Sequence, residues 1–540
     1  MWITSPCRRR IRNRLSACRG NSVVANLREL LESRKEHLPE KIFLFSEPDG
    51  REFSYQQFDY LVNQTANLLK SVGVETGTTV SLLLHNGVEY LLVYFACWKL
   101  GAVAGPINAR LQRLEIQYIL NHSEAVVLVT QASFWPMVEA IRSELAFLQQ
   151  VILIDERVEG TIDYGAELSQ QSSQLSPTTL EPDVEAIIIY TSGTTGKPKG
   201  VLLTHGNLMA NARQIADWLK FEPDDRFLCI MPLFHMNAVA VTTLTPLHVG
   251  ASIVLSPRFS ARRHWQIIAD YGVTTFGSVA TMLSMLLNTY PDGVPAGLDT
   301  SRLKFAMCGS APVPLPVMQQ FEEWFHCPVI EGYGLSESTC RSTFNPPDAR
   351  RRLGSVGLPI GNEMKIFDDD DNELPPGHIG EIVLRGENVM KGYFKNPEAT
   401  QQAFRNGWFH TGDVGYQDED GFFYVVDRKS DMIIRGGENI YPREIDEVLY
   451  QHPAVKDAAT IGVPDELYGE EVKAFIVLKD GMRGTTDELL AFCRARLADY
   501  KCPKTIEFLD DIPKGPTGKL LKRELSASHR ATEFAEQIKK

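Results

Sequence analysis

The run from Tyr190 to Gly200 combines the residue types that bind phosphate. Three glycines free its backbone to turn tightly and expose N–H groups, while four hydroxyls and two lysines add hydrogen bonds and positive charge. It is not a Walker loop, because Thr191 stands where that motif has its first glycine and Pro198 replaces its Ser or Thr. We predict a loop that cradles phosphates, with a plain polar hairpin as the alternative. The residues concerned are Thr191, Ser192, Gly193, Thr194, Thr195, Gly196, Lys197 and Lys199.

Two acidic residues further along the chain are suited to complete a nucleotide site. Glu337 ends the turn Glu331–Glu337, and its carboxylate is explained if Mg²⁺ lies between it and the phosphates. Tyr333, in the same turn, offers a flat face for a purine. Asp413 follows a Thr-Gly pair and has the acceptors to take both ribose hydroxyls. Taken singly, each has an ordinary alternative: a surface glutamate, a packed tyrosine or a turn aspartate.

Five segments in this order resemble the adenylate-forming superfamily. That superfamily includes acyl-CoA synthetases, firefly luciferases and the adenylation domains of nonribosomal peptide synthetases. The resemblance extends over residues 40–525, and each segment alone would be weak evidence for the family. The matching segments are Thr191–Gly200, Glu331–Glu337, Thr411–Asp413, Asp427-Arg428 with Arg435–Pro442, and Pro516–Lys519.

The resemblance implies a role for each matched residue in binding ATP. Glu337 would bind Mg²⁺ and, with Thr191 and Lys519, would be catalytic. Ser336 is commonly Thr in the family, so the hydroxyl is kept. Besides the phosphate loop and Lys519, the implied ATP-binding residues are Ser310, Glu331, Gly332, Tyr333 against adenine, Ser336 on the α-phosphate, and Asp413 with Arg428 on the ribose.

Lys519 lies among prolines, glycines and basic residues, a composition that alone predicts a solvated tail. By resemblance it is the lysine that enters the site during adenylation, where an ammonium group stabilises the charge that builds on the α-phosphate. The small C-terminal domain would then rotate about a hinge at 427–431, with Ser430 at the pivot where Asp or Lys is usual. The loop with Gly436, Gly437 and Glu438 would replace Lys519 and leave a channel for the pantetheine arm of CoA.

The acyl pocket is expected around His235, Asn237, Gly309 and Gly334. Amino-acid-activating relatives typically carry Asp at the position of His235, and a buried ammonium without a carboxylate would be costly, so amino acids are disfavoured. The alternative for His235 is a packed core histidine. Ser310 replaces a more usual glycine and would narrow the pocket. We predict a short, medium or polar-substituted acid, and a long chain is not excluded.

The resulting functional prediction is an ATP-dependent acid–CoA ligase with ATP, Mg²⁺ and CoA as cofactor and co-substrates. An acid and ATP would give acyl-AMP and pyrophosphate, and CoA would then give acyl-CoA and AMP. The alternative is an acyl-adenylating enzyme that loads a separate carrier protein. A luciferase-like oxygenase and a non-catalytic nucleotide-binding relative are the other classes considered. The acid itself, the pathway and the oligomeric state stay open.

The elements that must position these residues alternate along the chain. Short strand-like runs such as Ala186–Tyr190 and Phe227–Met231 alternate with helical stretches such as Ala261–Tyr271, a pattern typical of parallel α/β sheets. From about Gly357, short strands separated by turns predict an antiparallel or barrel-like insert. The expected fold is α/β, with two βαβ-type subdomains and a small β-barrel in a large N-terminal domain, followed by a small mobile α+β domain.

The expected boundaries are a basic tail at 1–22, an N-terminal domain at 23–426, the hinge, and a C-terminal domain at 432–540. The tail holds six arginines and no acid, which fits a disordered segment, a misplaced start codon or a mitochondrial transit peptide. The net charge of −13 disfavours a nucleic-acid partner. No apolar stretch is long enough to span a membrane. Nine scattered cysteines without a Cys-x-x-Cys pair favour the cytoplasm.

Overall fold

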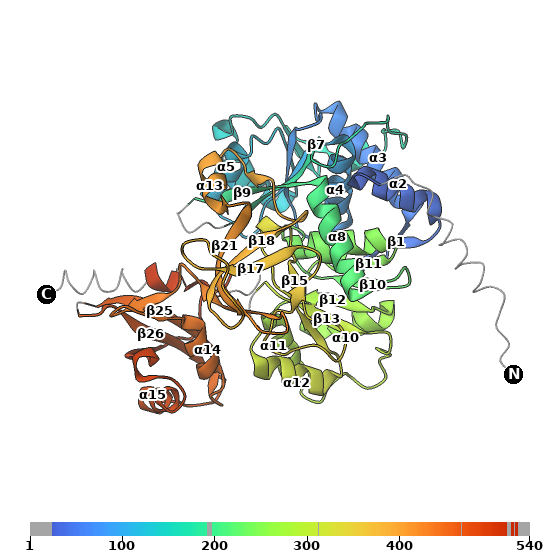
Figure 1. Cartoon of the computed structure of the whole chain (residues 1–540). Helices are drawn as coiled ribbons and strands as arrows, with labels where there is room; N and C mark the ends of the chain where they lie inside the picture. Colours follow the sequence, from blue (N-terminus) through green and yellow to red (C-terminus); the bar gives the residue numbers. More distant parts are fainter. Residues whose placement is uncertain are drawn as a thin grey trace.

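The computed structural model describes residues 24–191, 197–310, 313–465, 467–515, 520–522 and 524–527. The predicted basic tail, the loop residues Ser192–Gly196 and Lys519 lie outside the described residues. The chain forms a large body and a smaller C-terminal part beside it, drawn in orange-red (Figure 1). No helix in the described ranges is both long and apolar enough to cross a membrane.

Sheet A has seven strands in the order β14-β13-β12-β10-β11-β1-β2. All run parallel except β2, which is antiparallel to β1. Trp265, Phe276 and Phe321 are fully buried where helices cover this sheet. The strands are β1 (Ile42–Ser46), β2 (Glu52–Ser54), β10 (Arg226–Cys229), β11 (Ser252–Leu255), β12 (Thr275–Ser278), β13 (Phe305–Cys308) and β14 (Val329–Glu331); the helices are α10 (Ala261–Tyr271), α11 (Ala280–Thr289) and α12 (Leu315–Phe325).

The strands β12, β13 and β14 end level with one another. Ser278 pairs with Cys308, and Cys308 pairs with Glu331, so the residues that follow emerge side by side at one edge. The carboxyl edge of a parallel sheet is where ligands bind in open α/β folds. Gly309 and Gly332 are the first residues beyond this edge on β13 and β14.

Sheet B has eight strands in the order β19-β9-β8-β4-β3-β5-β6-β7. The six strands from β8 to β7 in this order are parallel, and β9 and β19 extend the sheet antiparallel. The strands are β3 (Thr79–Leu83), β4 (Val103–Pro106), β5 (Val127–Thr130), β6 (Gln150–Leu153), β7 (Ile162–Asp163), β8 (Glu185–Thr191), β9 (Lys199–Thr204) and β19 (Gly392–Tyr393).

Sheets A and B each form the centre of one lobe of the large body. Helix α4 (Val88–Leu100) lies in the interior of the first lobe, the one that contains sheet B. Every residue of it except Glu89 is buried, as expected for a helix that is apolar on all sides. It therefore accounts for the longest apolar run of the sequence. The other helices of this lobe are α2 (Leu27–His37), α3 (Tyr55–Ser71), α5 (Arg113–His122), α6 (Trp135–Glu139) and α7 (Tyr164–Leu168).

Helix α8 (His205–Leu219) connects the two sheets. A capping box begins it, since Thr204 Oγ1 accepts the Asn207 N–H (3.1 Å) and the Asn207 side chain accepts the Thr204 N–H (2.9 Å). Against it packs η3 (Asn237–Leu244), a π-helix that continues into α9 (Thr245–Val249). A π-helix of this length is rare, and such helices are frequent at functional sites.

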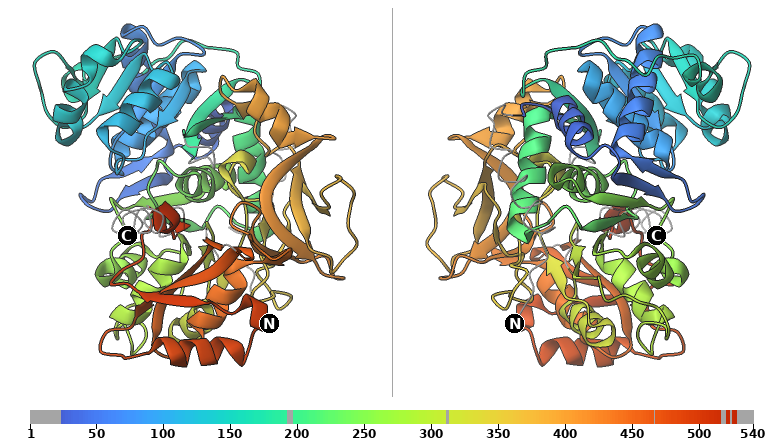
Figure 2. Two further views of the ribbon diagram at one scale, coloured as in Figure 1. Left: turned by 90° about the vertical axis from the view of Figure 1, so that its left-hand side faces the viewer. Right: turned by 90° about the vertical axis from the view of Figure 1, so that its right-hand side faces the viewer.

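An antiparallel sheet D follows, and it lies along the side of the two lobes (Figure 2). Its path is β17-β18-β21-β20, with β22 also paired to β21, and it forms a half barrel among the described strands. The elements are β17 (Glu363–Phe367), β18 (Gly380–Arg385), α13 (Pro397–Ala403), β20 (Phe404–Arg405), β21 (Trp408–Gln417) and β22 (Phe423–Arg428), with the short pair β15 (Thr343–Phe344) and β16 (Leu358–Pro359) nearby in sequence.

The C-terminal part is a small α+β unit with its own core. Ile445 of α14, Leu489 of α15 and Ile476 of β26 are fully buried in it. Together with the two lobes and the half barrel, this unit confirms the predicted fold class. Its elements are β23 (Ile433–Arg435), β24 (Glu438–Ile440), α14 (Pro442–Tyr450), β25 (Val455–Asp465), β26 (Gly469–Leu478), α15 (Thr486–Arg494) and β27 (Thr505–Phe508).

Candidate functional site

The candidate phosphate loop connects the antiparallel strands β8 and β9. Thr191, the last residue of β8, is the cross-strand partner of Lys199, the first residue of β9. The strands on either side of the candidate loop therefore pair as a hairpin, and Ser192–Gly196 between them lie outside the described residues. Lys197 Nζ lies 5.6 Å from the ring centroid of Tyr118, and Lys199 Nζ lies 4.9 Å from that of Tyr393. Both predicted phosphate-binding lysines are therefore placed by aromatic faces.

Three of the predicted ATP-binding residues form one hydrogen-bonded cluster. Tyr333 Oη donates to Asp413 Oδ2 (2.6 Å), and Arg428 Nε lies 3.2 Å from Asp413 Oδ1. Asp413 and Arg428 are direct partners across β21 and β22, so the antiparallel pairing itself brings them together. Asp413 is buried, and burial together with its negative charge raises the pKa of Tyr333 well above the usual range. Each Asp413 oxygen keeps a free lone pair, which is the capacity that two ribose hydroxyls need.

Glu337 lies beside this cluster, in the 3₁₀ turn η4 (Ser336–Ser338). Its Oε1 accepts a hydrogen bond from Tyr393 Oη (3.0 Å), and its carbonyl accepts the Met390 N–H (2.7 Å). Burial raises the pKa of Glu337, which means that the neighbouring groups do not fully compensate its negative charge. An oxygen-only carboxylate in that condition fits a divalent cation such as Mg²⁺.

Tyr393 is a site residue that the sequence reasoning missed. Its ring packs against Lys199 and its hydroxyl binds Glu337, so it joins the end of the phosphate loop to the candidate metal ligand. Tyr393 reaches this place because β19 pairs with β9, nearly two hundred residues away in sequence. The segment around Tyr393 contains no motif, and only the strand pairing reveals its role.

Glu331 and Gly332 stand where β14 ends. Glu331 is buried, its Oε1 accepts the Val313 N–H (3.3 Å), and burial raises its pKa to about 7. A Cβ on Gly332 would lie 2.6 Å from the Thr343 carbonyl oxygen, so only glycine allows the two segments to approach this closely. These two residues thus form the floor of the turn that presents Tyr333.

Ser310 follows β13 with a φ of +72°. That left-handed conformation is cheap for glycine and strained for serine, which gives a physical reason why glycine is the more usual residue here. The Ser310 side chain is exposed. The substitution therefore adds backbone strain at the same edge of sheet A as the other site residues.

The predicted acyl-pocket residues His235 and Asn237 precede and begin the π-helix η3. His235 Nε2 has no hydrogen-bond partner in the described part of the chain, and burial lowers the pKa of His235 to about 4, so the ring is neutral at pH 7. Asn237 is 4% exposed, and neither its amide nitrogen nor its amide oxygen has a partner among the described residues. Buried amides without partners are rare in folded proteins and call for an explanation.

The other two predicted acyl-pocket residues are Gly309 and Gly334, and neither position has room for a side chain. A Cβ on Gly309 would lie 2.6 Å from the Gly332 carbonyl oxygen and 2.7 Å from Arg341 Cζ. A Cβ on Gly334 would lie 2.8 Å from the Cys340 carbonyl carbon and 2.9 Å from Arg341 Cα. Both glycines therefore adjoin the same residue, Arg341, which the sequence reasoning did not single out.

The predicted CoA-channel residues form the tip of a hairpin in the C-terminal part. Gly436 and Gly437 connect β23 to β24, and both have positive φ (59° and 91°), as a two-residue I′ turn requires. Glu438 at the end of this turn is exposed. Behind it, Arg435 makes a bidentate pair with Glu471 (2.6 and 2.9 Å), which fixes the base of the hairpin. The described residues show no hydrogen bond between this hairpin and the nucleotide cluster.

The predicted hinge, residues 427–431, includes the end of β22 and most of the connection from β22 to β23. β22 ends at Arg428 and β23 begins at Ile433. Ser430 is exposed, and its hydroxyl donates to Asp431 Oδ1 (3.0 Å). Two hydrogen bonds tie the connection down, from the Lys429 N–H to the Gly412 carbonyl (2.8 Å) and from the Arg443 N–H to Asp427 Oδ2 (2.8 Å).

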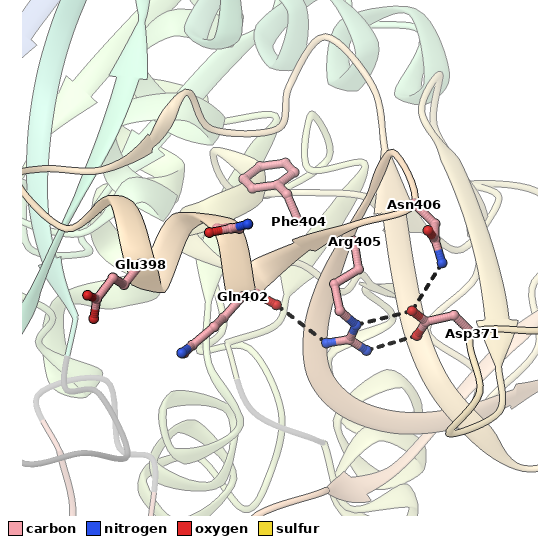
Figure 3. Close-up of a pocket in the computed structure, with 7 residues that line it drawn as sticks. Asp371, Glu398, Gln402, Phe404, Arg405 and Asn406 are labelled. Carbon is pink, nitrogen blue, oxygen red and sulfur yellow. Dashed lines mark hydrogen bonds and ion pairs between the residues drawn. The ribbon is translucent and has the colours of Figure 1, made fainter.

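A surface pocket of about 510 Å³ lies apart from these groups, on sheet D (Figure 3). Arg405 points at Asp371 and pairs with it (2.9 and 3.2 Å), Asn406 Nδ2 donates to the same carboxylate (3.2 Å), and Arg405 Nη1 donates to the Gln402 carbonyl (3.4 Å). Arg405 and Asp371 in this pocket neutralise each other. It contains none of the predicted site residues.

Comparison with known proteins identifies the family. The sequence profile of the AMP-binding enzymes matches residues 31–394, and that of the AMP-binding enzyme C-terminal domain matches residues 444–519. The chain is 38% identical over 508 residues to a sulfoacetate–CoA ligase of Cupriavidus necator, covering 93% of this chain and 98% of the relative. It is 36% identical over 484 residues to a crotonobetaine/carnitine–CoA ligase of Salmonella arizonae, covering 88% and 93%.

Two solved structures extend the comparison to the fold. The anthranilate CoA ligase AuaEII in complex with anthranoyl-AMP superimposes with a TM-score of 0.87 at 30% identity, covering 94% of this chain and 98% of that one. The o-succinylbenzoate CoA synthetase MenE from Bacillus subtilis, in complex with the acyl-adenylate intermediate, gives 0.81 at 34% identity, covering 92% and 97%. The chain therefore belongs to the AMP-binding enzyme family, and the prediction of an AMP-forming acyl-CoA synthetase is confirmed.

Proposed function

We propose that the protein is an ATP-dependent acid–CoA ligase that first makes an acyl-adenylate with release of pyrophosphate and then transfers the acyl group to CoA with release of AMP. The observation that carries the proposal is the joining of two residue groups. Tyr333, Asp413 and Arg428 form a nucleoside-binding cluster, and Lys199, Tyr393 and Glu337 form a chain of contacts beside it. ATP bound to both would have its ribose on Asp413 and its phosphates between Lys199 and Glu337.

The roles of the individual residues follow from their chemistry. Asp413 accepts the ribose hydroxyls and Arg428 keeps its charge in place. Tyr333 presents its ring to adenine, while Ser336 and the phosphate loop, beginning at Thr191, bind the phosphate oxygens. Glu337 would hold Mg²⁺, which, when bound, neutralises charge on the phosphate oxygens. Lys519 would stabilise the negative charge on the α-phosphate while the acid carboxylate attacks.

We propose the domain boundaries 23–426 and 432–540, with residues 427–431 as the hinge for the second half-reaction. Rotation would withdraw Lys519 and bring in the hairpin with Gly436, Gly437 and Glu438 as the wall of the CoA channel. The hydrogen bond from the Arg443 N–H to Asp427 crosses the junction, so a full rotation would have to break it. It biases the free enzyme towards the observed arrangement.

The proposed substrate is a short or medium carboxylic acid with a polar substituent. His235 is neutral, and the unpartnered amide of Asn237 lies close to it in sequence, so the acyl side offers hydrogen bonds. The relatives named for sulfoacetate and for crotonobetaine or carnitine act on short acids with charged substituents, which supports this choice. A long unbranched chain would leave the Asn237 amide unsatisfied.

The test is AMP release from ATP and Mg²⁺ over a panel of carboxylic acids, with and without CoA. We expect AMP formation that requires both an acid and CoA, and an acid optimum well below sixteen carbons. Acid-dependent exchange of pyrophosphate into ATP with no response to CoA would instead support loading of a separate carrier protein. A Lys519→Ala variant should lose adenylation and keep most of the thioester half-reaction when supplied with acyl-AMP.

A further inference from the structure

Arg341 is a buried cation whose charge nothing in the described chain neutralises. It is 1% exposed, and its Nε and Nη2 have no hydrogen-bond partner. Its Nη1 makes only a long contact of 3.4 Å with the Gly332 carbonyl, and its guanidinium lies 5.3 Å from the ring centroid of Phe344. A guanidinium stays protonated in proteins, so burying it without an anion is strongly unfavourable.

The backbone of Arg341 is nevertheless held firmly. Asn211 of α8 accepts the Arg341 N–H (3.1 Å) and donates to the Arg341 carbonyl (2.6 Å), and Asn388 donates to the same carbonyl (3.3 Å). Two residues earlier, Thr339 has a φ of +67°, a strained conformation for a β-branched residue, and its hydroxyl donates to the Asn388 carbonyl (2.7 Å). The guanidinium is therefore positioned in advance rather than free to reach solvent.

The surroundings of the guanidinium are the proposed acyl pocket. A Cβ on Gly309, the first residue beyond the carboxyl end of β13, would lie 2.7 Å from Arg341 Cζ, and a Cβ on Gly334 would lie 2.9 Å from Arg341 Cα. On the neighbouring strand β12, a Cβ on Gly277 would lie 2.7 Å from Asn237 Oδ1. Glycines on adjacent strands thus make room for an unpaired guanidinium and an unpaired amide at one edge of sheet A.

Glu331 carries a carboxylate at this same edge of sheet A, so it is a candidate counter-ion for Arg341. It is also buried, and burial raises its pKa to about 7, with the charge of Arg341 opposing this only as one of the smaller influences. A carboxylate in close ion pairing with a buried arginine would have a lowered pKa instead. No ion pair joins the two within the described ranges. Glu331 is therefore not the counter-ion of Arg341.

We propose that Arg341 determines substrate specificity by binding a second anionic group, a carboxylate or a sulfonate, on the acid that the enzyme activates. The planar guanidinium would bind that group through Nε and Nη2, the two nitrogens left without partners, in the bidentate arrangement that arginine makes with such oxygens. Asn237 would donate a further hydrogen bond. The inference rests on the proposed function and narrows its substrate to acids with two negative charges.

The test compares pairs of acids of matched shape that differ in the second charge. The pairs are malonate with isovalerate, succinate with 4-methylpentanoate, and 3-sulfopropionate with 4,4-dimethylpentanoate. We expect the wild-type enzyme to favour the dianionic member of at least one pair by about 100-fold or more in kcat/KM, because the unpaired guanidinium penalises an uncharged group. Arg341→Met should abolish or reverse that ratio. Arg341→Lys should give an intermediate ratio, since it keeps the charge without the fork.

Arg350→Met is the matched control, because Arg350 is exposed and pairs only with Asp348 in its own loop. In this variant the ratio of kcat/KM between the two acids of a pair should equal that of the wild type. A wild-type preference for the uncharged acids would overturn the role of Arg341 while leaving the ligase function intact. Absence of CoA-dependent AMP formation with every acid would overturn both. Equal loss of all acids in both Arg341 variants, with a lowered Tm, would show that Arg341 serves the fold alone.

Discussion

The nucleotide half and the acyl half of the candidate site differ in how their polar groups are satisfied. In the nucleotide half, Tyr333 and Arg428 each contact one oxygen of Asp413, and Tyr393 binds Glu337. In the acyl half, Asn237 and Arg341 carry buried nitrogens and oxygens without partners among the described residues. Each of these side chains in the first half has a protein partner, whereas the second half contains buried groups that a ligand could satisfy. Nucleotide binding is common to the family, and the acid is what each member must select.

Lys99 is a buried cation outside the candidate site, and it provides a comparison for Arg341. Like Arg341 it is 1% exposed, but its ammonium pairs with Asp59, donates to Asn63 Oδ1 (2.8 Å) and lies 3.6 Å from Glu32. The same chain therefore gives a structural cation two carboxylate partners, whereas Arg341 has none among the described residues. This difference supports a ligand-directed role for Arg341.

The largest expected effect is in the nucleotide half, from Asp413→Asn. The change removes the charge that holds Arg428 and one pair of acceptors for ribose, and breaking a partly buried ion pair of this kind costs several kcal/mol. We expect kcat/KM for ATP to fall by about 100-fold or more with every acid, leaving the ratio between acids unchanged. Asp418→Asn, which affects the Arg352 pair on the same sheet, is the control. A change in acid selectivity in Asp413→Asn would contradict the division into two halves.

A smaller effect is expected from Tyr393→Phe, which removes the hydrogen bond to Glu337. Burial raises the pKa of Glu337 and the Tyr393 hydroxyl opposes that rise, so the variant should have a still higher Glu337 pKa. The ionised carboxylate is needed to bind Mg²⁺. As the pH is lowered, the variant should therefore lose activity at a higher pH than the wild type does. We expect the Mg²⁺ concentration for half-maximal rate to rise by roughly 10-fold at pH 6 and by less at pH 8.

Tyr424→Phe is the matched control, since the Tyr424 hydroxyl contacts Asp418 away from the site. Its pH profile and Mg²⁺ dependence should follow the wild type. If Tyr393→Phe shows the same profile as this control, Glu337 is not the metal ligand.

The sequence predicted the elements of the fold best where they carry periodicity. The helix Ala261–Tyr271 begins and ends as predicted, because it has a strong apolar face and a clear terminus. The antiparallel pairing of β9 with β8 was not predicted, since a strand next to a parallel group gives no local signal of its direction. The short strands β12 and β14 were also missed, because β14 has only three residues and β12 contains a glycine and a serine, which weaken a strand pattern.

For the site, the sequence predicted residues that lie in contiguous motifs and missed those placed by tertiary contacts. Asp413 and Tyr333 were predicted to share a nucleotide, and the structure brings them into contact. Tyr393 was missed because its role depends on a pairing between distant strands. Arg341 was missed because arginine is ordinarily exposed and its burial is invisible in sequence. The roles of all the predicted site residues stay predictions, and Ser192–Gly196 and Lys519 also lie outside the described residues.

In the acyl half, Asn237→Leu should change selectivity at little cost in stability. The Asn237 amide has no partner to lose, so an apolar side chain of similar size removes a desolvation penalty without breaking a hydrogen bond. We expect Tm to stay the same or rise, and the preference for polar over apolar acids to fall by about 10-fold. A marked loss of Tm would mean that the amide has a structural partner after all.

The smallest effect is expected from Ser310→Gly, which lies between the two halves. Ser310 has a φ of +72°, so glycine should relieve strain of roughly 1 kcal/mol, partly offset by the greater freedom of glycine in the unfolded chain. We expect a net gain of about 0.5 kcal/mol or less in the free energy of unfolding, measured by urea titration. His326→Gly, at the end of α12 with a φ of +51°, is the matched control outside the site and should give a similar gain. If both variants gain stability but only Ser310→Gly alters KM for the acid, the strain at Ser310 shapes the pocket. If neither alters KM, the serine affects stability alone and the selectivity of the acyl half depends on Asn237 and Arg341.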